Sequence, residues 1–101
     1  SVACAAKFLC NVNGSVEMGV GNLANIHLAA AASPVKLSCV VPVSMPAESQ
    51  NGNVGGIYYI DDLIKDPFKL VEGCIEVPEG KGFGIEVDEN KIERYRDTSL
   101  R

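Results

Sequence analysis

Residues 8–43 read FLCNVNGSVEMGVGNLANIHLAAAASPVKLSCVVPV, in which two short apolar runs flank a long alanine-rich run. Residues 8–12 and 35–43 have the length and the apolar, partly β-branched composition of buried strands. Residues 18–32 carry no charged side chain and are rich in alanine and leucine, which favours a helix. A strand, a helix and a second strand joined by tight turns form a βαβ unit of a parallel sheet. We therefore predict an α/β fold.

Turn-forming residues mark the boundaries of these three segments. Asn13-Gly14-Ser15 breaks the first apolar run, and Ser15 is suited to cap the helix because its hydroxyl can accept from the amides of the first turn. Ser33-Pro34 ends the helix, since the residue before a proline is disfavoured in the helical region. Residues 1–7 are rich in alanine and resemble the last turns of a preceding helix.

Functional groups are expected where the two predicted strands end, because parallel strands direct their carboxyl ends to one edge of the sheet. The positions of interest are therefore residues 13–17 and 40–42. Glu17 is the only carboxylate among the first 47 residues. A carboxylate in the first turn of a helix is also favoured by the helix dipole alone, so a structural role and a binding role are compatible.

Composition excludes several classes of function. A net charge of −4 argues against a nucleic-acid partner, because phosphate binding needs a basic surface. No run is apolar and long enough to span a membrane, and no secretory signal is recognisable, so we expect a cytoplasmic protein. The four cysteines lack metal-site or disulfide spacing and are expected to be reduced core thiols. They are Cys4, Cys10, Cys39 and Cys74.

The charged residues are concentrated in the second half of the chain. Residues 1–47 carry three charged side chains, whereas residues 48–101 carry twelve acidic and seven basic ones. The first half has few charged side chains to present to water, so we expect it to be covered either by the second half or by chain outside these residues, and we favour the latter. In the second half we predict a loop at residues 44–56, a helical turn at residues 61–65, and a short final helix capped by Asp88.

Two segments resemble the enolase superfamily, in the branch of muconate-lactonising enzyme and mandelate racemase. Residues 72–90 read EGCIEVPEGKGFGIEVDEN and are followed by Ile92 and Tyr95, which is similar to the closing stretch of that family. Residues 14–17 read GSVE and precede a helix containing IHLAAA at residues 26–31, which is similar to the end of the seventh strand and the seventh helix of its barrel.

The resemblance implies a modified (β/α) barrel with an α+β capping domain. Residues 1–47 would be the barrel segment with the seventh and eighth strands and the helix between them, and residues 48–101 would return to the capping domain. It also implies a metal-dependent racemase, epimerase or cycloisomerase that removes the α-proton of a carboxylate substrate through an enediolate. A dehydratase of a hydroxy acid or hydroxy amino acid, and a non-catalytic piece that completes a barrel supplied by another chain, are the alternatives.

The family's Mg²⁺ ligands and base lysines lie on strands that this chain does not contain, so the resemblance implies no catalytic residue and no metal ligand here. It places Glu17, with Ser15, Asn13 and Val40, at the rim of the substrate pocket. The partners that it implies are the rest of the barrel and capping domain and a small carboxylate substrate, in a complete protein that forms homo-oligomers.

The sequence departs from parts of the family pattern. No histidine stands near Asn13, which disfavours the subgroup with a histidine base, and His27 is interpreted as a packing residue. No acid ends the second strand, which weakens a dipeptide epimerase specificity.

Overall fold

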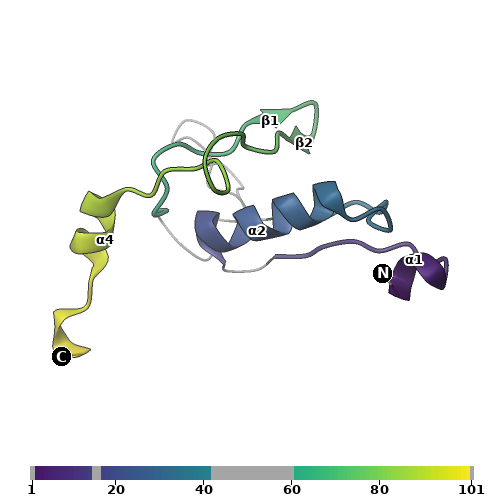
Figure 1. Ribbon diagram of the computed structural model, residues 1–101. Helices are drawn as coiled ribbons and strands as arrows, with labels where there is room; N and C mark the ends of the chain where they lie inside the picture. The colour runs from purple at the N-terminus through teal and green to yellow at the C-terminus, as the bar shows by residue number, and fades with distance from the viewer. Residues whose placement is uncertain (1, 15–16, 42–60, 101) are drawn as a thin grey trace.

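The computed structural model describes residues 2–14, 17–41 and 61–100 (Figure 1). Its elements, in chain order, are α1 (Val2–Ala5), α2 (Met18–Ala31), β1 (Leu70–Val71), β2 (Cys74–Ile75), α4 (Glu89–Tyr95) and the 3₁₀ turn η2 (Thr98–Leu100). None of the described helices combines the length and the apolar character that crossing a bilayer requires. Ser15, the predicted loop at residues 44–56 and the boundary between residues 47 and 48 lie outside the described residues.

The long helix α2 confirms the prediction for residues 18–32 to within one residue. It ends at Ala31, and the C-cap residue Ala32 has an extended backbone (ψ 114°) that leads into Ser33-Pro34. The predicted N-terminal cap is different, because the N-cap position is Glu17 and its side chain makes no capping hydrogen bond. The helical end predicted for residues 1–7 is present as the single turn α1.

The segments on either side of α2 run parallel to each other. Cys10 bridges to Val35 and Asn13 bridges to Val40, both in parallel register. The Val40 amide donates to the Val12 carbonyl at 3.1 Å, and the Gly14 amide donates to the Val40 carbonyl at 2.6 Å. The predicted βαβ connection is therefore present in the described residues. The two strands themselves are isolated bridges and not regular strands, because a parallel pair needs neighbours and two covered faces to form a full ladder.

The segment that carries β1 and β2 lies along α2, whereas α4 and η2 extend away beyond one end of it (Figure 1). β1 and β2 form an antiparallel hairpin with Leu70 opposite Ile75. The prediction of a helical turn at residues 61–65 is wrong, because Ile64 bridges antiparallel to Val87 and the Lys65 amide donates to the Glu86 carbonyl. The final helix α4 begins as predicted, with Asp88 accepting hydrogen bonds from the amides of Asn90 and Lys91.

The core of the described residues lies between α2 and this returning segment. Leu23 and Ile26 from α2 and Ile64 and Phe68 from the C-terminal part are its buried apolar side chains. His27 adds a polar link, since its Nε2 donates to the Phe83 carbonyl at 2.9 Å and its ring lies 5.3 Å from the Phe83 ring. These contacts agree with the interpretation of His27 as a packing residue.

The prediction that the cysteines are core residues is wrong for this chain. Cys4, Cys39 and Cys74 are exposed and Cys10 is half-buried.

Candidate functional site at the carboxyl ends of the parallel segments

Asn13 and Val40 lie opposite each other where the two parallel segments end. Besides their backbone bridge, the Asn13 Oδ1 accepts from the Val40 amide at 3.3 Å and from the Asn11 Nδ2 at 3.3 Å. Asn11 also donates to the Ser38 carbonyl at 3.4 Å. The amide side chains thus tie the two ends together, while the apolar Val40 is 55% exposed and forms a wall beside them.

Glu17 is at the same end of the molecule, directly before α2. A methyl group at Gly14 would lie 3.1 Å from the Glu17 Oε2, so the carboxylate reaches back to the end of the first segment. A methyl group at Gly21 would lie 2.6 Å from the Glu17 Cβ, so the side chain also lies against the next turn of the helix. The small residues Gly14 and Gly21 therefore leave the room in which the Glu17 side chain sits.

Two further amide side chains, those of Asn22 and Asn25 on α2, lie close to Gly14 and were not among the predicted site residues. A methyl group at Gly14 would clash with the Asn22 Oδ1 and would lie 3.3 Å from the Asn25 Nδ2. Asn22 is completely buried, whereas Asn25 is half-buried. Because they are three residues apart in a helix, Asn22 and Asn25 lie on one face of α2, a signal that could have indicated them.

The structure therefore brings together three of the four predicted site residues, Asn13, Glu17 and Val40. The fourth, Ser15, lies outside the described residues. Chemically, the described residues Glu17, Asn13 and Val40 offer a carboxylate beside an amide and a valine side chain. A carboxylate accepts hydrogen bonds from N–H and O–H groups and attracts an ammonium group. The same carboxylate repels an anionic group of a ligand.

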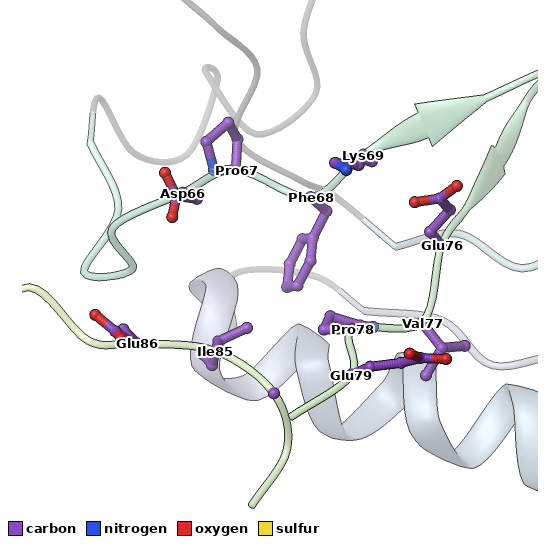
Figure 2. Close-up of a pocket in the computed structure, with 11 residues that line it drawn as sticks. Asp66, Pro67, Phe68, Lys69, Glu76, Val77, Pro78, Glu79, Ile85 and Glu86 are labelled. Carbon is purple, nitrogen blue, oxygen red and sulfur yellow. The ribbon is translucent and has the colours of Figure 1, made fainter. Parts of the chain in front are cut away.

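A separate groove of about 810 Å³ lies on the C-terminal part of the chain (Figure 2). Phe68 points into it toward Pro78 and Ile85, as Figure 2 shows. Its polar lining is mostly acidic and consists of Asp66, Lys69, Glu76, Glu79 and Glu86. The Lys65 ammonium, 2.8 Å from the Glu86 carboxylate, holds the pKa of Glu86 below its usual range. The described site residues Asn13, Glu17 and Val40 do not line this groove.

Among residues 2–14, 17–41 and 61–100, no three His, Cys, Asp or Glu side chains lie close enough together to hold a metal ion. The described residues therefore do not by themselves fit the Mg²⁺ that the family resemblance implies.

Known proteins with similar sequences include a dehydratase, a cycloisomerase and a racemase. The chain is 51% identical to D-gluconate dehydratase of Thermoproteus tenax over 35 residues, which is 35% of this chain and 7% of that protein. It is 23% identical to muconate cycloisomerase 1 of Rhodococcus opacus over 94% of this chain and 22% of that protein. It is 27% identical to N-succinylamino acid racemase of Thermus thermophilus over 82% of this chain and 19% of that protein.

The chain thus spans about a fifth or less of the length of these curated relatives. No solved structure matches it significantly. A model of the enolase C-terminal domain-like family matches residues 1–91. Because that match includes both the parallel segments with α2 and the returning C-terminal part, the chain belongs to the enolase C-terminal domain-like family of the enolase superfamily, in the branch of mandelate racemase and muconate-lactonising enzyme.

Proposed function

We propose that this chain forms one wall of the substrate pocket in an enzyme that removes the α-proton of a carboxylate substrate and returns it, as a racemase or epimerase does. The observation that carries the proposal is the convergence of Asn13, Glu17 and Val40 at the carboxyl ends of two parallel segments. In barrels of this type the active site is assembled at that end of the strands. The Mg²⁺ and the base would come from residues outside the described ones, and Mg²⁺ would stabilise the negative charge that develops on the substrate carboxylate.

The charge of Glu17 narrows the substrate class. Because a carboxylate repels a second carboxylate, Glu17 would not lie against the carboxylate of the substrate. It would face a part of the substrate that carries an N–H, an O–H or an ammonium group. The amide N–H of an N-succinylamino acid offers such a donor. Muconate, a dicarboxylate without a donor, does not, so the proposal favours racemisation or epimerisation over cycloisomerisation.

Dehydration of a hydroxy acid is the second candidate. It is favoured by the 51% identity to D-gluconate dehydratase, although this covers 35 residues. The hydroxyl groups of gluconate could donate to Glu17 as well. The two reactions differ in their product, since a racemase retains the carbon skeleton and its substituents, whereas a dehydratase releases water and forms a keto acid.

Both candidates are tested with the complete protein that contains this chain. It is incubated with Mg²⁺ in deuterated water with N-succinylamino acids, D-gluconate or muconate, and ¹H NMR follows the α-proton and any keto acid. We expect α-proton exchange with a substrate that carries a donor. Absence of exchange and of dehydration with every compound that offers a donor would overturn the proposal.

The role of Glu17 is tested by Glu17→Gln, which keeps the shape and removes the charge. A hydrogen bond to a charged group contributes about 1.5–3 kcal/mol, so kcat/KM should fall about 10- to 100-fold. Glu93→Gln is the matched control. Glu93 is a surface carboxylate on α4 that pairs with Arg96, and it is distant in sequence from the candidate site. We expect the control to stay within about twofold of the parent. Equal activity of Glu17→Gln and the parent would remove Glu17 from the pocket.

A further inference from the structure

The N-terminal turn of α2 is held by a residue that follows it by more than forty positions. The Asp62 Oδ1 accepts a hydrogen bond from the Gly19 amide at 2.9 Å and from the Leu63 amide at 2.7 Å. Asp62 is only 4% exposed. The first amides of a helix have no partner within it, and the N-cap residue Glu17 does not supply one with its side chain. Asp62 therefore supplies from outside the helix part of the capping that a local residue would otherwise provide.

The same turn of α2 is locked sterically. A methyl group at Gly19 would lie 2.7 Å from the Ile64 Cδ1 and 3.0 Å from the Asp62 Oδ1. Ile64 is itself buried at 3% exposure and belongs to the core with Leu23. The helix backbone at Gly19 thus lies directly against the segment that carries Asp62, with no room for a larger residue between them.

The residue between Glu17 and Gly19 has an uncommon backbone. Met18 has φ +56°, in the left-handed region that a side chain with a Cβ rarely adopts. Such a conformation costs on the order of 1 kcal/mol or more and persists only where the surroundings determine it. Met18 lies between the candidate site residue Glu17 and Gly19, whose amide donates to Asp62.

We propose that Asp62 is a positioning residue, which sets the orientation of the Glu17 carboxylate through the Gly19 amide and the left-handed Met18. The Glu17 carbonyl accepts from the Gly21 amide at 3.2 Å, so Glu17 moves with the first turn of α2. If the Gly19–Asp62 bond is lost, that turn is free to relax at Met18, and the carboxylate leaves its place beside Gly14. This inference rests on the proposed function, because it matters for activity only if Glu17 contacts the substrate.

Asp88 provides a matched control for Asp62. Both are aspartates that accept two backbone amides, and both cap a helix N-terminus, α2 for Asp62 and α4 for Asp88. In the complete enzyme, Asp62→Ala and Asp88→Ala should both lower the melting temperature. Only Asp62→Ala should lower kcat/KM, by at least tenfold, when both are assayed at a temperature at which they are folded. Asp62→Asn keeps an acceptor oxygen and should recover most of the lost activity.

The double variant with Glu17→Gln shows whether Asp62 acts through Glu17. We expect Asp62→Ala to reduce kcat/KM of the Glu17→Gln enzyme by less than about twofold, because the charge that it positions is already absent. A full additional tenfold loss would overturn the positioning role, as would equal kcat/KM losses in Asp62→Ala and Asp88→Ala.

Hydrogen exchange separates this proposal from the proposed function. Asp62→Ala should accelerate exchange of the first amides of α2, including Gly19, and leave those of α4 unchanged, whereas Asp88→Ala should do the reverse. If exchange changes in this way but Glu17→Gln is fully active, the proposed role of Glu17 fails while the Asp62 cap stands. If Glu17→Gln is impaired but Asp62→Ala keeps normal exchange and activity, the positioning proposal alone fails.

Discussion

At the scale of single residues, Asp61 joins two side chains of α4 to the segment that precedes β1. Its Oδ1 lies 2.8 Å from the Lys91 Nζ, and its Oδ2 accepts from the Tyr95 hydroxyl at 2.8 Å. Hydrogen bonding by Lys91, followed by that of Tyr95, lowers the pKa of Asp61 to about 2. Both partners belong to α4, so a single carboxylate attaches this helix to the segment that also carries Asp62.

The lowered pKa of Asp61 predicts how its contribution to stability depends on pH. A carboxyl group whose pKa is lower in the folded state stabilises that state above its unfolded pKa of about 3.8, and the contribution is lost as the pH falls toward about 2. Because the Asp61 and Lys91 side chains are 30% and 26% exposed, we expect about 1 kcal/mol at neutral pH. Asp61→Asn in the complete protein should therefore lower the free energy of unfolding by this amount at pH 7, and by clearly less at pH 3.

Urea titrations at the two pH values check this expectation. Glu93→Gln is a suitable control, because it breaks a more exposed pair with Arg96 and should change the free energy of unfolding by less than about 0.5 kcal/mol. A destabilisation by Asp61→Asn that is the same at pH 7 and pH 3 would contradict the ion-pair interpretation.

At the scale of elements, the glycine-rich turn between β2 and α4 contains two glycines with different constraints. Gly82 (φ +61°) and Gly84 (φ +85°) both have left-handed backbones. A methyl group at Gly82 would meet nothing within 4 Å, whereas one at Gly84 would lie 2.8 Å from the carbonyl carbon and oxygen of Pro78. The turn therefore needs glycine at Gly82 for its conformation alone, and at Gly84 also for space.

We predict that alanine is tolerated unequally at these two positions. The left-handed conformation alone costs an alanine about 1 kcal/mol, which is the effect expected for Gly82→Ala. At Gly84 the backbone of Pro78 must also move, and such a clash adds about 1–3 kcal/mol. Melting temperatures of the two complete variant proteins measure the difference. Equal destabilisation would mean that the Pro78 backbone yields without cost.

The elements also show how far the sequence could predict this structure. The helix at residues 18–32 is predictable because its signals are local: the run carries no charge and Ser33-Pro34 ends it. The cap at Asp88 is also predictable from the local sequence. The cap of α2 was predicted at Ser15, whereas the observed amide partner is Asp62. Nothing in the local sequence of either segment indicates a contact over 43 positions. The strands were predicted from apolar runs, but a regular ladder depends on neighbouring strands that local composition does not supply.

The candidate site was predictable in part from the sequence. Asn13, Glu17 and Val40 were selected by the rule that parallel segments end at one edge, and the structure places them together. Asn22 and Asn25 were missed because an asparagine in a helix has no distinctive pattern until the residue that it faces, here Gly14, is known.

At the scale of the whole molecule, the first half of the chain exposes large apolar side chains. Among the described residues, Phe8 is 67% exposed, Leu9 63% and Leu37 49%, and all three lie in or beside the parallel segments. By contrast, the buried apolar core of the described residues consists of four side chains. Parallel segments in barrels are covered on both faces by helices and further strands, and their unpaired edges bind other chains. We infer that the uncovered surface is completed by the rest of the barrel, on the same polypeptide or on another chain.

This inference predicts that the 101-residue chain does not fold cooperatively by itself. A core this small cannot offset the conformational entropy of ordering the chain, so the isolated chain should bind the dye ANS and show no sharp thermal transition. Co-expression with the rest of the barrel should remove the dye binding and give one cooperative transition, because the same apolar side chains become buried. A monomeric isolated chain with a sharp transition and no dye binding would contradict the inference. It would then favour a self-sufficient domain, in which Phe8, Leu9 and Leu37 are covered by the chain itself.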